Sequence, residues 1–217
     1  MLNFKFILLF AICGFTQAKL INLSCKQIRA FVDGHNSRRL QLVKGQVPGQ
    51  PPASDMKLMM WDNELEAKAA KWASRNNFAH NPDKTIGSRR FHTGENLYWY
   101  ATTDLTHKLD VESSLRSWFD EHRNYSYGPL TMRDFTKSTK KQIGHYTQMA
   151  WASTIYVGCA ISQYTKNNFK EFLVVCNYGP GGNYIGQKPY ESRRRRGAAN
   201  ALTCGAKNCN QRYGDRC

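Results

Sequence analysis

Apolar residues recur at helical spacing in three stretches of the chain. Between Gln27 and Val43 they alternate with basic and polar residues every three or four positions, and Gly45 follows as a stop signal. From Glu64 to Ala79 strong helix formers surround one apolar face, and Asp62 offers a cap. A third stripe runs from His107 to Asn124. The pattern therefore predicts three helices.

Two later stretches are rich in β-branched and aromatic residues. They run from Tyr156 to Tyr164 and from Glu171 to Tyr178, and the polar cluster 165–168 separates them. We expect a β-hairpin here. The segment from Gly45 to Asp55 holds three prolines and reads as a connecting loop. Helices first and a hairpin late indicate an α+β fold, because repeating βαβ units would alternate strands with helices.

The first eighteen residues have the pattern of a secretory signal peptide. Lys5 precedes an apolar run from Phe6 to Phe15, and the small residues of Thr16-Gln17-Ala18 supply a cleavage site. This run is shorter than the about 20 apolar residues that a transmembrane helix needs. We therefore expect cleavage after Ala18 and a secreted, extracellular chain with no transmembrane span.

Secretion determines which chemistry we expect of the cysteines. Cys13 would leave with the signal peptide, and an oxidising compartment favours disulfides among the others. Six cysteines allow fifteen connectivities. Cys159 and Cys176 lie on the two predicted strands and can face one another, so we expect this pair to be bonded. The pairing of the rest stays open; they are Cys25, Cys204, Cys209 and Cys217.

The composition changes after Tyr190. The main domain is therefore expected over residues 19–190, and residues 191–217 form a basic tail that contains cysteines. The arginine run 193–196, followed by Gly197, is a candidate processing site. Two sequons are candidate glycosylation sites, one at Asn22 and one at Asn124.

Several separate motifs resemble the CAP superfamily of cysteine-rich secretory, antigen 5 and pathogenesis-related 1 proteins. The two signature segments are 144–151, which reads Gly-His-Tyr-Thr-Gln-Met-Ala-Trp, and 175–184, which reads Val-Cys-Asn-Tyr-Gly-Pro-Gly-Gly-Asn-Tyr. Shorter matches occur at His35-Asn36-Ser37-Arg38-Arg39, at Gly94-Glu95-Asn96 and at Trp118-Phe119-Asp120-Glu121. Together they cover residues 27–190, and the proline loop is most similar to the venom-allergen or antigen 5 branch.

This resemblance implies a three-layer α-β-α sandwich with a small antiparallel sheet, and a large cleft that holds two histidines and two glutamates. Carried over by motif, these are His80, Glu95, Glu121 and His145. Two imidazoles and two carboxylates form a plausible set of ligands for zinc or another divalent metal. The same groups also suit a hydrogen-bonded network that needs no ion.

The resemblance further implies a secreted binding or effector protein that modulates host tissue or defence. The alternative is a metal-dependent hydrolase, such as a protease, in which a glutamate activates a metal-bound water. We favour binding, because the chain has no Gly-x-Ser-x-Gly elbow and its exported cysteines suit disulfides better than catalysis.

An extracellular protein, a lipid or an anionic glycan is the expected partner. Some relatives hold sterols or fatty acids, and an aromatic set around the Gly-Glu-Asn motif could line such a groove: Phe91, Leu97, Tyr98, Trp99 and Tyr100. The chain has 31 Lys and Arg against 16 Asp and Glu, a net charge of +15. This charge favours anionic surfaces, with the cluster Lys137, Lys140 and Lys141 and the arginine run as footprints. Nucleic acid is not expected, because the basic residues are dispersed and no nucleic-acid motif accompanies them.

Overall fold

The computed structural model describes residues 18–136, 141–192 and 201–217. Residues 1–17 of the predicted signal peptide, the arginine run 193–196 and two lysines of the basic cluster, Lys137 and Lys140, lie outside these residues. In the part of the chain that is described, no helix combines the length and the apolar character that crossing a membrane requires.

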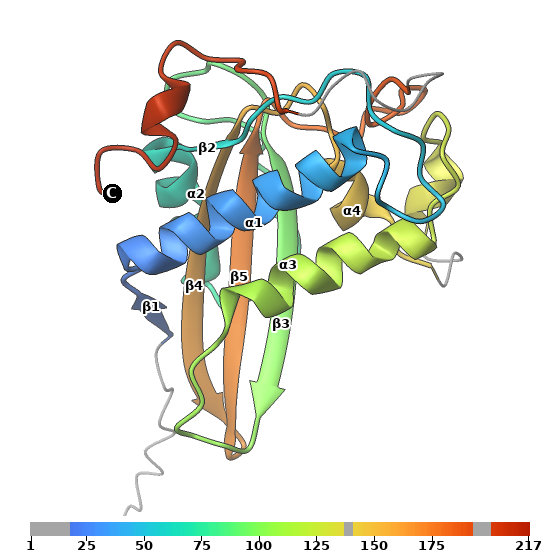
Figure 1. Cartoon of the computed structure of the whole chain (residues 1–217). Helices are drawn as coiled ribbons and strands as arrows, with labels where there is room; N and C mark the ends of the chain where they lie inside the picture. The colour runs from blue at the N-terminus through green and yellow to red at the C-terminus, as the bar shows by residue number, and fades with distance from the viewer. Residues whose placement is uncertain (1–17, 137–140, 193–200) are drawn as a thin grey trace, which may run out of the picture.

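A five-stranded sheet forms the middle layer (Figure 1). The strands are β1 (Lys19–Ile21), β2 (Met60–Trp61), β3 (Gly94–Thr102), β4 (Tyr156–Lys166) and β5 (Phe169–Gly179). Their order is β1-β4-β5-β3, all antiparallel, while β2 pairs with β4 in parallel.

Helices cover both faces of this sheet (Figure 1). They are α1 (Cys25–Val43), α2 (Asn63–Ala73), α3 (Val111–Asp120) and α4 (Gly144–Met149), with short 3₁₀ turns η1 (Glu121–Arg123), η2 (Met132–Phe135) and η3 (Cys209–Gln211). The alternation of side chains along β5 separates two cores. Val174 and Cys176 belong to the larger core with α1, α3 and α4, whereas Leu173 and Val175 pack against α2. The predicted α-β-α sandwich is therefore confirmed.

The predicted hairpin is present, and each strand is longer than expected. Lys166 pairs with Phe169, so the turn has the two residues Asn167 and Asn168, with φ of 50° and 65°. Asparagine tolerates this left-handed conformation, which suits the twist of a tight hairpin. Cys159 and Cys176 are direct cross-strand partners, and a disulfide joins them.

Two predicted helices have different ends in the structure. The second ends at Ala73 instead of Ala79, because Ser74 closes it and Asn76 takes a positive φ of 49°. The third begins at Val111 instead of His107, because the Asp110 side chain accepts from the backbone N–H of Glu112 and starts the helix there. Propensity alone does not register these local hydrogen bonds and backbone turns.

One disulfide ties the tail to the main domain, and a second lies within the tail. Cys25 at the start of α1 is bonded to Cys217, and Cys204 is bonded to Cys209. Backbone hydrogen bonds add to this, since Thr203 pairs with the segment around Lys57. A cut within the arginine run would therefore leave the tail covalently attached.

Close contact between α2 and β4 depends on Gly158. A Cβ atom at this position would lie 2.2 Å from the backbone N of Glu66 and 2.5 Å from the carbonyl C of Leu65. Rigid helix backbone cannot move aside as a flexible side chain does. A side chain at residue 158 must therefore push α2 away from the sheet.

We expect Gly158→Ala to lower the free energy of unfolding by about 1–3 kcal/mol or more, as overpacking does in well-packed cores. Urea unfolding followed by tryptophan fluorescence measures this loss. Gly128→Ala is the matched control, because a Cβ there meets only the Ser126 carbonyl oxygen, at 3.9 Å. A change as small for Gly158→Ala as for the control would contradict the proposed packing.

Candidate functional site

A cleft of about 420 Å³ opens where β3 begins and α4 starts. Three of the four residues expected at the site line it, namely His80, Glu95 and His145. The other lining residues are Asp134, Phe135, Thr136, Lys141, Gln142, Ile143, Gly144 and Asn183. The fold thus brings together groups that lie up to about a hundred positions apart in the sequence.

Glu95, the second residue of β3, orients His80. Its Oε1 lies 2.9 Å from His80 Nδ1 and also accepts from the backbone N–H of Asn81, at 2.9 Å. The other carboxylate oxygen accepts from the side-chain amide of Asn177, the cross-strand neighbour of Glu95. The carboxylate is 2% exposed, whereas the imidazole is 59% exposed. His80 is therefore the solvent-accessible member of the pair.

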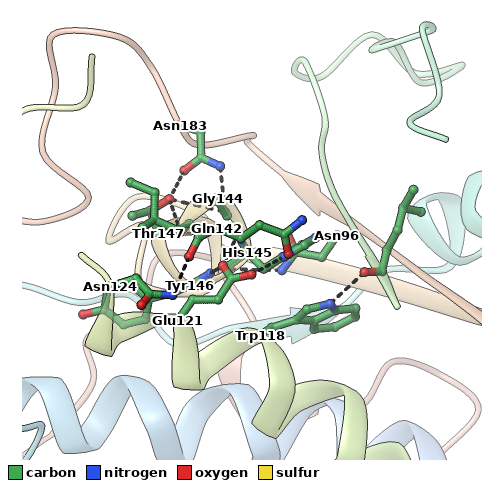
Figure 2. A network of polar contacts seen from close by, with 12 residues as sticks. Asn96, Trp118, Glu121, Asn124, Gln142, Gly144, His145, Tyr146, Thr147 and Asn183 are labelled. Atoms are coloured by element: carbon green, nitrogen blue, oxygen red, sulfur yellow. Dashed lines mark hydrogen bonds and ion pairs between the residues drawn. The ribbon is translucent and has the colours of Figure 1, made fainter. Parts of the chain in front are cut away.

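Glu121 orients His145 in the same way from the end of α3. Its Oε1 lies 2.6 Å from His145 Nδ1, while Oε2 accepts from the backbone N–H groups of His145 and Tyr146 (Figure 2). These amides belong to the first turn of α4, whose N-cap residue, Ile143, makes no side-chain cap. Glu121 therefore caps α4 from another element and stabilises its positive end. The Trp118 ring stacks on the His145 imidazole.

Hydrogen bonds occupy all four carboxylate oxygens of the two glutamates. Because each glutamate accepts from an Nδ1, the ring nitrogen left to each histidine for a ligand is Nε2. Glu121 does not line the cleft, and nowhere in the described ranges do three His, Cys, Asp or Glu residues form a cation site. The four residues are thus two oriented histidines, each with its supporting glutamate, rather than four equivalent ligands.

Neutral polar residues hold α4 in place. Asn96 Nδ2 donates to the His145 carbonyl at 3.1 Å, and Asn183 Nδ2 donates to the Gly144 carbonyl at 2.8 Å (Figure 2). Thr147 donates in turn to Asn183 Oδ1. Sequence reasoning assigned no role to these residues. Their only signal was their position inside the motifs, Thr147 and Asn183 in the signature segments and Asn96 in the shorter Gly-Glu-Asn match.

The loop that carries His80 has a support of its own. Asn76 and Asn77 follow α2 at the start of this loop. Here the indole of Trp72 on α2 donates to the Ala79 carbonyl at 2.7 Å. A side chain from a buried helix face thus holds the backbone directly before His80.

A family model described as the cysteine-rich secretory protein family, CAP, matches residues 32–178. The chain belongs to the CAP family. The matched region contains α4, the whole of the first signature segment, the start of the second and all four residues of the two histidine–glutamate pairs. This confirms the resemblance on which the site residues were predicted.

The curated relatives of this CAP protein include wasp venom allergens. It is 33% identical to venom allergen 5 of Polistes fuscatus over 186 residues, which is 83% of this chain and 87% of the relative. It is also 33% identical to venom allergen 5.02 of Dolichovespula maculata, covering 83% and 84%. Among solved structures, NaASP2 with Zn²⁺ matches with a TM-score of 0.64 and 30% identity, covering 79% of this chain and 88% of that one.

The aromatic residues around the Gly-Glu-Asn motif do not share one groove. Leu97 packs against α2, whereas Tyr98 and Tyr100 pack against the larger core on the opposite face. Phe91 stacks on Tyr156. These positions therefore do not line one shared groove, because side chains alternate between the two faces along a strand.

A buried polar chain links α1 to the cleft. His35 Nδ1 donates to the Phe31 carbonyl, and His35 Nε2 accepts from the Tyr178 hydroxyl at 2.9 Å. Asn96 donates to the same hydroxyl oxygen and to the His145 carbonyl. Burial lowers the pKa of His35 from 6.5 to about 3. His35 therefore stays neutral in the folded protein under conditions in which the unfolded chain binds a proton.

We expect this difference to make the protein less stable as the pH falls from 6.5 towards 3, by up to about 1.4 kcal/mol per pH unit from His35 alone. His35→Gln should be less stable at neutral pH, yet lose less stability on acidification. Urea unfolding across this pH range tests the effect. Tyr178→Phe, which keeps the imidazole buried, should retain the dependence, whereas parallel curves for the parent and His35→Gln would contradict it.

Proposed function

We propose that this CAP protein is an extracellular, secreted binding protein whose cleft holds a divalent cation between His80 and His145. The supporting observation is that both imidazoles line one cleft and that a glutamate fixes each ring through Nδ1. Ring nitrogens of this kind bind Zn²⁺ well. The similar NaASP2 was crystallised with Zn²⁺, which agrees with the proposal.

Binding is favoured over catalysis by what surrounds these histidines. None of the described residues that line the cleft is serine or cysteine. Glu121 does not line the cleft and the Glu95 side chain is only 2% exposed, so neither glutamate presents an open carboxylate to a water. The alternative, a metal-dependent hydrolase, requires one of these carboxylates to reach a metal-bound water.

With only two protein nitrogens, a bound ion would keep open positions for water or for a group of the partner. Such an ion would supply concentrated positive charge inside the cleft. Open coordination positions and positive charge would let the ion bind a polar or anionic group of a ligand. The partner class stays an extracellular protein, a lipid or an anionic glycan.

Titration calorimetry with Zn²⁺ tests the cation site. We expect His80→Ala and His145→Ala to abolish measurable binding, because each removes one of two nitrogen ligands. Glu95→Gln and Glu121→Gln should weaken binding by about 10- to 100-fold, as loss of an orienting partner does at metal sites. His107→Ala is the control, since that ring packs on Tyr100 and Phe172 near the Thr102 end of β3, whereas the cleft lies at the Gly94 end.

Two results would decide against the proposal. Unaltered Zn²⁺ binding in both histidine variants would place the ion elsewhere. Hydrolysis of peptide or ester substrates by the parent, lost in a folded His145→Ala variant, would support the hydrolase instead.

A single-chain anionic lipid is the second candidate ligand, on the strength of a different cavity. This cavity of about 450 Å³ lies between β1, the start of α1 and the segment before α3. Its apolar wall contains Leu20, Ile21, Leu109 and Phe172, and two lysines, Lys19 and Lys108, also line it. An apolar wall with cationic groups suits a fatty acid, whose carboxylate needs a charge partner.

We expect the protein to bind a fluorescent fatty acid, and Leu109→Asp to weaken that binding at least several-fold by placing a carboxylate in the apolar wall. Fluorescence titration measures the dissociation constant. Lys71→Asp, a charge change on the exposed face of α2, is the control. Equal affinity in parent and Leu109→Asp would exclude this cavity as the lipid site.

A further inference from the structure

The histidine cleft continues into a second cavity of about 500 Å³. The two cavities share Asp134, Lys141 and Ile143 along their walls. One groove therefore runs from His80 at one end to Tyr125 and Pro129 at the other. Lys141 lies at the junction and is exposed, so it reports on access to both parts.

Asn124 lies on the wall of the second cavity, directly after η1. It is exposed, as is Ser126 two positions later, which completes the sequon. Its side-chain amide donates to the Gln142 carbonyl at 3.2 Å, and Gln142 itself lines the histidine cleft (Figure 2). A group attached to the Asn124 side chain is therefore bound next to Gln142, which lines the histidine cleft.

We propose that Asn124 carries an N-linked glycan that shields the Tyr125 end of this groove from polypeptides and leaves the His80 end open to ions and small molecules. A branched oligosaccharide is bulky and hydrated, and it is rooted here at the cavity wall. His80 lies at the far end and is largely exposed, whereas the His145 side chain is 19% exposed. The glycan thus acts as a size filter on the recessed histidine.

The chemistry of attachment is compatible with the local contact. A secretory transferase moves the oligosaccharide from a lipid diphosphate donor: the bond from sugar C1 to phosphate oxygen breaks, and a bond from C1 to Asn124 Nδ2 forms. The lipid diphosphate leaves, and the amide gives up one proton. Nδ2 keeps one N–H, so its donation to Gln142 can persist and hold the first sugar beside the cleft.

The sequon at Asn22 supplies an internal comparison. Asn22 is also exposed, but it lines the cavities beside β1 rather than the histidine cleft. Its hydroxyl residue, Ser24, is the N-cap of α1 and forms a capping box with Gln27. The Asn22 site is therefore best removed by Asn22→Gln, because a change at Ser24 would also weaken the helix.

The test uses the full chain secreted from a glycosylating eukaryotic cell. Glycopeptide mass spectrometry measures occupancy in the parent, Asn124→Gln, Ser126→Ala and Asn22→Gln. Each protein is then acylated with a small N-hydroxysuccinimide acetate or with the same ester on a long polyethylene glycol chain. Peptide mapping compares Lys141 with the exposed reference Lys71 on α2.

We expect the parent to be occupied at Asn124. Both Asn124→Gln and Ser126→Ala should raise polymer labelling of Lys141 several-fold with little change in acetylation. Ser126→Ala keeps the Asn124 side chain, so agreement between the two variants assigns the effect to the sugar. Asn22→Gln should change neither reaction at Lys141.

An unmodified Asn124, or polymer labelling that is equal with and without the sequon, would overturn the proposal. This proposal rests on the proposed cation site only for the identity of the small species that enters the cleft. Shielding of Lys141 without Zn²⁺ binding would refute the cation site alone. Zn²⁺ binding without shielding would refute the size filter alone.

Discussion

Arg39 joins α1 to the segment around Lys57 and to the segment that ends and follows α4. It projects from α1 and is fully buried, where an unpaired charge would be prohibitively costly. No carboxylate of the described residues forms a salt bridge with it; instead its guanidinium donates to five backbone carbonyls, those of Lys57, Met149, Trp151, Ala152 and Thr154. Burial lowers the pKa of Arg39 to about 9, so it remains charged at neutral pH. A lysine has three donors and could not replace this planar five-donor group.

The histidine cleft depends on that arrangement. One carbonyl bound by Arg39 is that of Met149, the last residue of α4, and another is that of Trp151 just after it; α4 is the helix that begins with Gly144 and His145. Glu121 binds the other end, and Asn96 binds the His145 carbonyl from β3. A six-residue helix has little stability of its own, and these contacts hold it at both ends. The imidazoles are thus oriented by the protein itself, which reduces the entropy lost when a ligand binds.

The sequence-based predictions were accurate where a feature depends on neighbouring residues, and inaccurate where it depends on residues far apart in the sequence. The hairpin was predicted because alternation and a polar turn are local, and the two asparagines of that turn accept its left-handed backbone. The second helix was predicted six residues too long, since its end depends on Asn76 and on the contact between Trp72 and the Ala79 carbonyl. An even number of cysteines did not predict that Cys25 pairs with Cys217, because this bond requires residues 192 positions apart to meet.

The amino-acid sequence by itself determined the family, three of the helices, the hairpin of β4 and β5, and which two histidines and two glutamates are candidate site residues, since these follow from local pattern and from motif. It did not predict β1, β2, β3 or α4. Only the tertiary structure decided what each group does. A carboxylate can bind an ion or orient a neighbour, and the choice depends on which donors surround it. Glu95 and Glu121 meet N–H groups from loops, strands and a helix start that folding brings to them. Those donors occupy the carboxylates and leave the imidazoles to face the cleft.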